Sequence, residues 1–95
     1  MTARTLYRVM LVEDNPADAR LVREALAEHP RFSFQVVHYP YLEQALKFLE
    51  RDSVDVALLD YHLPDVENLD GLDRIIAAAP NLPVVMLTGV DDEAL

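Results

Sequence analysis

Four short runs rich in apolar residues divide the chain, and polar or turn-forming residues follow each run. Apolar runs of this length are typical of strands in a sheet that is buried on both faces. Proline, aspartate or glycine comes within a few residues of each run, as expected where a strand ends in a turn. The pattern predicts strands at Leu6–Val12, Phe32–Val37, Val56–Leu59 and Val84–Leu87, with His38-Tyr39-Pro40 breaking the second.

The segments between these strands carry apolar residues at the spacing of amphipathic helices. The first helix should begin at Pro16, with Asn15 or Asp14 as its N-cap, because proline fits the first helical turn. A further helix start is expected at Asp91 or Asp92, after the fourth strand. The three apolar stripes are Leu21, Val22, Ala25 and Leu26; Leu42, Ala45, Leu46 and Leu49; and Leu69, Leu72, Ile75, Ile76 and Ala79.

Strands and helices therefore alternate along the whole chain. This order implies right-handed crossovers and a parallel sheet with helices on both faces, which is an α/β, doubly wound fold. The 95 residues, 52% of them hydrophobic, suit one domain with its own core. No apolar run approaches the roughly 20 residues of a membrane span.

Charge and cysteine content narrow the classes of function. The chain has no cysteine, so it has no disulfide framework and no thiolate metal site, and we expect a cytoplasmic protein. The net charge of −9 repels nucleic acid phosphates and anionic membranes. A direct role in nucleic acid or membrane binding is therefore disfavoured, whereas a cation or a basic partner surface would fit.

Acidic residues stand at the ends of two predicted strands. Glu13 and Asp14 follow the first strand, and Asp60 follows the third. If these strands are neighbours, the carboxylates converge at the sheet edge where α/β proteins bind ligands. Converging carboxylates repel one another unless a cation is present, and a few hard oxygen ligands suit Mg²⁺. For any one acid, capping a turn or helix is the simpler interpretation; for the set together we favour a site.

Other candidate residues are weaker when taken alone. Thr88 ends the fourth strand, where its hydroxyl could donate to an anion on Asp60, although an ordinary strand-end threonine is the simpler interpretation. His29, His38 and His62 show no metal-ligand spacing. His62 stands two residues after Asp60, so its backbone carbonyl can face the same site. His29 is interpreted as a helix end, and His38 as a strand end.

Three segments together resemble the receiver domain of bacterial two-component response regulators. They read Val-Met-Leu-Val-Glu-Asp-Asn-Pro (9–16), Val-Ala-Leu-Leu-Asp-Tyr-His-Leu-Pro-Asp (56–65) and Val-Val-Met-Leu-Thr-Gly (84–89). The resemblance implies a flavodoxin-like sheet with strand order 2-1-3-4. It also implies a cytoplasmic phosphoacceptor in a phosphorelay, not an enzyme, and a histidine kinase or phosphotransfer protein as its partner.

The same resemblance assigns roles to residues of this chain. Asp60 would accept the phosphoryl group, and Thr88 matches the switch hydroxyl. Mg²⁺ would be held by Glu13, Asp14, Asp60 and the backbone carbonyl of His62.

Two departures from the family pattern affect these expectations. The family usually has a glycine near the start of the third helix; Asn68 is the preferred match, since Gly71 would require a longer loop. The family's fifth strand and last helix have no counterpart, because the sequence ends within the expected fourth helix. The family's active-site lysine has none either, since the one lysine, Lys47, lies in the second helix. We therefore expect residues 1–95 to be a C-terminally incomplete receiver domain, which either self-associates through the Val84–Leu87 edge or is an ordered portion of a longer protein.

Two other functions remain open from the sequence. A degenerate receiver-like module would bind a protein partner without phosphorylation, which the missing lysine favours and the intact acids oppose. A Mg²⁺ phosphohydrolase with an aspartate nucleophile, of the haloacid dehalogenase type, would need an acid two residues after Asp60, and His62 stands there instead.

Overall fold

The structure, a computed structural model of the chain, describes residues 5–67 and 69–87. The expectations for Asn68, Thr88 and a helix near Asp91 lie outside these residues. The elements are β1 (Thr5–Val12), α1 (Pro16–Ala27), β2 (Phe32–Tyr39), α2 (Leu42–Leu49), β3 (Val56–Asp60), α3 (Asp70–Ala78) and β4 (Val84–Leu87).

The strands form a four-stranded sheet in the order β2-β1-β3-β4, and every pairing is parallel. This confirms the predicted strand order 2-1-3-4. The sheet order reverses at β1 and β3, which are neighbours although a helix, β2 and a second helix lie between them in the sequence. In the register of this pair Val12 lies opposite Leu59, so the residues that follow both strands leave the sheet at the same edge.

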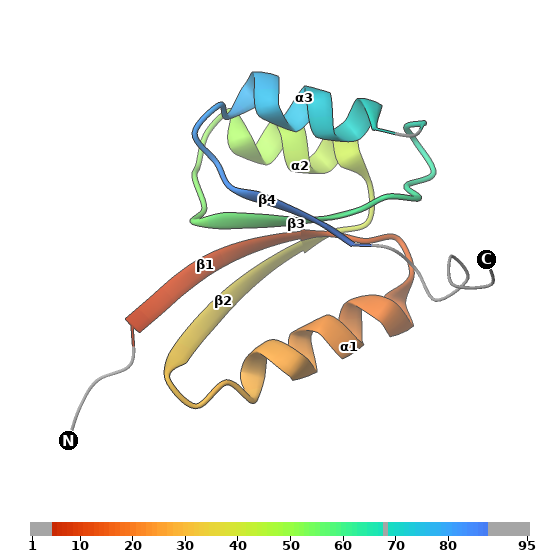
Figure 1. Cartoon of the computed structure of the whole chain (residues 1–95). Coiled ribbons are helices and arrows are strands. Elements are labelled where there is room, and N and C mark those ends of the chain that lie inside the picture. Colours follow the sequence, from red (N-terminus) through yellow and green to blue (C-terminus); the bar gives the residue numbers. More distant parts are fainter. Residues whose placement is uncertain (1–4, 68, 88–95) are drawn as a thin grey trace.

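Helices cover both faces of the sheet. Figure 1 shows α2 and α3 side by side on one face and α1 on the other. The main core fills the space between the sheet and the α2–α3 layer, where apolar side chains are removed from water. Its buried residues are Met10, Val12, Leu42, Ala45, Phe48, Ala57, Leu59, Leu63 and Ile75.

Strand β2 is two residues longer than predicted. It runs to Tyr39, so the expected break at His38 was wrong. The ladder with β1 continues through the pairs Leu11↔His38 and Val12↔Tyr39. Pro40, which has no amide hydrogen to donate, is the residue that follows the strand.

Several apolar residues of the predicted stripes are exposed. Leu21 on α1 is 62% exposed. Leu69, just before α3, is 50% exposed, and Ile76, on α3, is 46% exposed. On β4, Val84 and Met86 pack on the main core, whereas Val85, on the opposite face, is 48% exposed. The periodicity located the helices correctly, but apolar spacing does not show how much of each face is covered.

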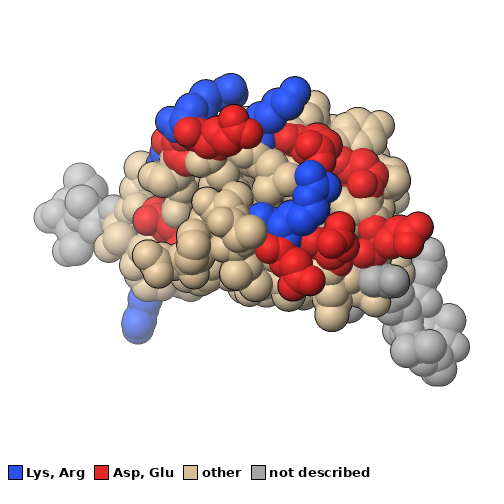
Figure 2. Space-filling model, turned by 90° about the horizontal axis from the view of Figure 1, so that it is seen from above, with Lys and Arg blue, Asp and Glu red and all other residues tan. Residues whose placement is uncertain are grey.

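Charged side chains of both signs mix on the face that carries α2 and α3. Figure 2 shows acidic side chains in several groups there, with basic side chains between them. Two of the pairs are Arg74 with Glu43, which links α3 to α2, and Arg8 with Asp52, which links β1 to the segment after α2. None of the helices that the structure describes is long and apolar enough to span a bilayer.

Candidate acidic site at the sheet switch point

The carboxyl ends of β1 and β3 bring three acidic side chains together. Glu13 and Asp14 follow β1, and Asp60 is the last residue of β3. One carboxylate oxygen from each lies within 4.8 Å of the others. The parallel register of the two strands explains this convergence, because it ends both strands at one edge of the sheet. The three acids that the sequence placed at strand ends therefore do form one group.

Glu13 is the most constrained member of the group. Its side chain is buried, and its Oε2 accepts a hydrogen bond from the Asn15 amide at 3.0 Å. Burial and, to a smaller extent, the neighbouring Asp60 carboxylate together raise the pKa of Glu13 to about 7, although the hydrogen bond from the Asn15 amide opposes the shift. Low dielectric and like charge both penalise the ionised carboxylate. A cation at this position would remove the penalty.

Asp60 is also buried, and the backbone of the turn that follows it contacts its carboxylate. Its Oδ1 accepts from the His62 amide at 3.1 Å. The strand continues past Asp60 by one more ladder bond, in which the Tyr61 amide donates to the Leu87 carbonyl at 2.9 Å. The structure therefore holds the backbone on both sides of Asp60. His62 lies in this turn, but its assigned role as a carbonyl ligand stays a prediction.

Asp14 is exposed, unlike the other two acids. It begins the turn into α1, whose N-cap is Asn15 as expected. The Asn15 side chain accepts from the amides of Ala17 at 2.9 Å and Asp18 at 3.2 Å. The acidic group is therefore enclosed on the protein side by Glu13 and Asp60, and open toward solvent at Asp14.

The donor set fits Mg²⁺. All three side chains offer carboxylate oxygens, which are the hard ligands that this ion selects. Mg²⁺ in proteins keeps several waters and uses few carboxylates, and the exposed side at Asp14 leaves room for water and phosphate oxygens. A bound cation would also stabilise the ionised form of Glu13, which burial and the Asp60 carboxylate destabilise.

Two residues near the acidic group make contacts that the sequence did not predict. His38 on β2 places its Nε2 2.7 Å from the carbonyl oxygen of Glu13. Asp65, in the loop after β3, accepts from the first two amides of α2, those of Leu42 and Glu43, both at 3.1 Å. These contacts join residues 25, 23 and 22 positions apart, and only the strand order brings them together.

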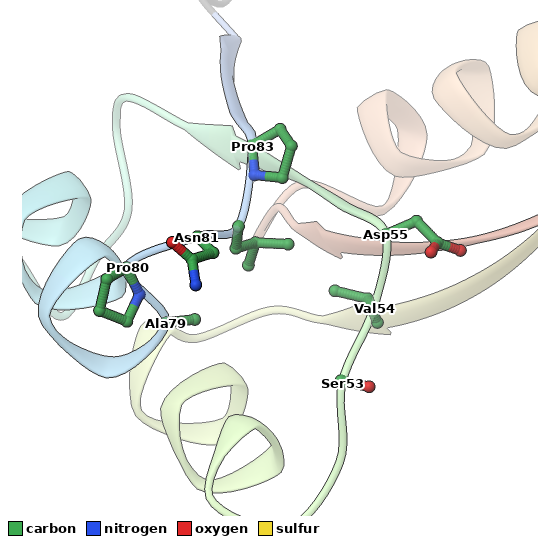
Figure 3. A pocket seen from close by; sticks show the side chains of 8 residues that line it. Ser53, Val54, Asp55, Ala79, Pro80, Asn81 and Pro83 are labelled. Carbon is green, nitrogen blue, oxygen red and sulfur yellow. The ribbon is translucent and has the colours of Figure 1, made fainter.

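The cavity in Figure 3 is separate from the acidic group. It measures about 380 Å³ and is lined by Ser53–Asp55 and Ala79–Pro83. These segments lead into β3 and β4 at their amino ends, whereas the carboxylates stand at the carboxyl ends. A second cavity, of about 550 Å³, lies beside the start of α3 and is lined by Asp65–Glu67, Leu69, Asp70 and Asp73.

Comparison with known proteins decides the family. The model of the response regulator receiver domain matches residues 9–95. The chain belongs to the response regulator receiver domain family. Receiver domains generally bind Mg²⁺ at an acidic group, and Glu13, Asp14 and Asp60 form such a group in this chain.

Receiver-domain relatives come from bacteria and from plants. A protein-glutamate methylesterase/protein-glutamine glutaminase of Rhodospirillum centenum is 31% identical over 84% of this chain. The transcriptional regulatory protein TrcR of Mycobacterium tuberculosis is 34% identical over 88% of it. The chain spans only 20% and 32% of these two proteins. It is therefore similar to one part of each of them.

Solved receiver structures agree with the fold. The phosphorylated cyanobacterial phytochrome response regulator RcpA is 30% identical and superimposes with a TM-score of 0.76, covering 96% of this chain and 70% of RcpA. The MaeR response regulator bound to beryllium trifluoride gives a TM-score of 0.76 over 88% of this chain and 68% of MaeR, at 24% identity. MaeR therefore supports the fold alone, while RcpA supports both fold and family.

Proposed function

We propose that this chain is a phosphoacceptor signalling domain in which Asp60 receives a phosphoryl group from a histidine kinase or a phosphotransfer protein. The observation that carries the proposal is the grouping of Glu13, Asp14 and Asp60 within 4.8 Å at the switch point of a receiver fold. The phosphorylated state named for RcpA, a relative at 30% identity, supports it.

Asp60 suits the role of nucleophile. It ends the central strand β3, and the His62 amide holds one of its oxygens at 3.1 Å, which fixes the direction of the carboxylate. In the proposed step a free oxygen of Asp60 attacks the phosphorus of a phosphohistidine. The new O–P bond forms as the N–P bond breaks, and the leaving imidazole nitrogen keeps the electron pair. The product is an acyl phosphate, a recognised form of covalent catalysis by carboxylates.

The other acids would serve a metal ion. Glu13, Asp14, Asp60 and the backbone carbonyl of His62 would hold Mg²⁺, which when bound neutralises charge on the transferring phosphoryl group. Burial of Glu13 keeps water away from one side of the group, and exposure of Asp14 gives the phosphodonor an approach from solvent. Thr88, which lies outside the described residues, is proposed as the hydroxyl that binds the phosphorylated aspartate.

The partner, location and activity follow as parts of the same proposal. The domain works in the cytoplasm, where its kinase or phosphotransfer partner presents the phosphohistidine. It assists its own phosphorylation and turns over no external substrate. The esterase activity named for the Rhodospirillum relative belongs to a protein of which this chain spans only 20%.

The test is phosphorylation with a small donor. The protein is incubated with acetyl phosphate and Mg²⁺, and intact mass spectrometry reports the addition of one phosphoryl group. Asp60→Asn should abolish the addition, whereas the matched control Asp73→Asn, an exposed aspartate on α3, should keep it. Chelation of Mg²⁺ should abolish it in both the wild type and the control.

Other outcomes would support the alternatives. No mass change in the wild type, together with binding of a partner protein, would indicate a degenerate receiver that works without phosphorylation. Steady release of phosphate from an aryl phosphate would indicate a phosphohydrolase, despite His62 at the position where that chemistry needs an acid. An addition that persists in Asp60→Asn would move the acceptor to another residue.

A further inference from the structure

We propose that His38 is a positioning residue for the metal site, acting through the backbone of Glu13. The inference rests on the proposed function, because it assumes that Glu13 and Asp14 bind Mg²⁺. Its basis is the contact of 2.7 Å between His38 Nε2 and the carbonyl oxygen of Glu13. That carbonyl belongs to the peptide group that joins the two candidate ligands.

The β1–β2 ladder cannot hold this peptide group by itself. The last paired residues are Val12 and Tyr39, and one further bond runs from the Glu13 amide to the Tyr39 carbonyl at 3.1 Å. Beyond that bond the strand pairing ends, because the next amide in this register, that of Tyr41, donates to Gln44 Oε1 at 3.2 Å and not to the Glu13 carbonyl. The His38 side chain supplies the donor that the backbone of β2 lacks at this point.

Together these bonds fix Glu13 from three directions. Its amide is bound by Tyr39, its carbonyl by His38 and its carboxylate by the Asn15 amide. With His38 removed, the peptide plane between Glu13 and Asp14 is free to rotate, and Asp14 follows that rotation. Asp14 is exposed and lies in the turn after β1, so packing does little to hold it in place.

The chemistry of the contact fixes which ring nitrogen carries the hydrogen. A carbonyl oxygen only accepts hydrogen bonds, so Nε2 must be the donor. His38 is half-buried, which excludes part of the water that would compete for this contact. This one hydrogen bond therefore orients both the imidazole ring of His38 and the peptide group after Glu13.

Precise placement matters for this ion. Mg²⁺ demands nearly ideal octahedral geometry at about 2.0–2.1 Å, so a small displacement of one ligand weakens binding. Removing groups that orient metal ligands typically costs about 10- to 100-fold in metal affinity. A histidine that served only to complete β2 would change the stability of the fold but not the affinity for Mg²⁺.

Two amide variants separate these roles. His38→Gln places its amide nitrogen three bonds from Cβ, as the imidazole places Nε2, so it can reach the Glu13 carbonyl. His38→Asn carries the same donor only two bonds from Cβ and cannot reach it. Mg²⁺ affinity is measured with MgCl₂ by NMR titration at pH 8, above the pKa of Glu13, and stability by urea unfolding with a chelator present.

We expect roughly tenfold weaker Mg²⁺ binding in His38→Asn and near wild-type binding in His38→Gln. In metal-free protein the carbonyl carbon signal of Glu13 should shift in the Asn variant and stay close to wild type in the Gln variant. Equal Mg²⁺ affinity in all three proteins would overturn the role of His38 while leaving the proposed function intact. A wild-type protein that does not bind Mg²⁺ would instead overturn the proposed function.

Discussion

Replacing Glu13 by glutamine should stabilise the metal-free protein at alkaline pH, although it removes a proposed metal ligand. The side chain is only 5% exposed, and it has a pKa of about 7 where an ordinary glutamate has 4.5. Glutamine has the same shape, and its carbonyl oxygen can still accept the hydrogen bond from the Asn15 amide. The substitution therefore removes the buried charge and leaves the packing in place.

The sign follows from proton binding in the two states. Below pH 4.5 Glu13 carries its proton in both the folded and the unfolded protein, so its contribution is constant. Between pH 4.5 and about 7 the unfolded chain loses the proton while the folded protein keeps it, and the folded state loses stability as the pH rises. Above about pH 7 Glu13 is ionised in both states, so the free energy of unfolding falls no further on its account. Glutamine has no proton to lose, so the advantage of Glu13→Gln should appear over this same interval.

The shift from 4.5 to about 7 sets the size of the effect. At about 1.4 kcal/mol for each pKa unit, the upper value of the gain in free energy of unfolding is roughly 3–4 kcal/mol. For a domain of this size, each kcal/mol corresponds to about 4–8 °C in melting temperature. We therefore expect a gain well above experimental error at pH 8, and none at pH 4.

Thermal melts from pH 4 to pH 9, with a chelator present, measure the difference between wild type and variant. Glu28→Gln, at an exposed residue just after α1, is the matched control for loss of one negative charge. Adding Mg²⁺ should raise the melting temperature of the wild type and not that of Glu13→Gln, because only a state that binds a ligand is stabilised by it. A difference that stays constant from pH 4 to pH 9, or a variant less stable at pH 8, would refute the reasoning.

Three further predictions concern stability and association. Asp65→Ala should lower the free energy of unfolding by about 1 kcal/mol in a urea titration, because the first two amides of α2 lose their acceptor. Asp65→Asn keeps an acceptor oxygen and should lose less, and equal losses in the two variants would show that Asp65 does not cap α2. Gly71→Ala should destabilise by up to ~1 kcal/mol despite better helix propensity, since its Cβ would lie 3.2 Å from Val66 Cγ2. Adding Val66→Ala should then recover stability, and a stabilising single variant would contradict the clash. Val85→Lys, on the exposed face of the β4 edge, should reduce self-association in sedimentation, whereas a wild type that is monomeric at all concentrations would exclude that association.

The sheet and the acidic group could be predicted from sequence because both depend on local signals. A continuous apolar run indicates a buried strand, and an acid directly after it must stand at the sheet edge. Once Val56–Leu59 and Val9–Val12 are taken as neighbouring parallel strands, Glu13 and Asp60 have to converge. The start of α1 was predictable for the same reason, since Asn15 and Pro16 act within one turn.

The remaining features depend on contacts between distant segments. The spacing of Leu21, Leu69 and Ile76 shows a helical face, but their exposure depends on what packs against that face. His38 reads as an ordinary strand end until the register puts it beside Glu13. A donor side chain opposite the end of a neighbouring strand is the one signal that could have indicated it, and using that signal requires the register first.

The link from Asp65 to α2 bears on how the domain folds. Helix α2 has eight residues, which is too short to be stable by itself in water. Its first two amides donate to the carboxylate of Asp65, which lies 23 and 22 residues later in the chain, beyond β3. Local opening of the loop after β3 would therefore fray α2 as well, so that the two behave as one cooperative unit in hydrogen exchange. A disturbance at the end of β3 is thus transmitted to a helix on the surface of the domain through two backbone amides.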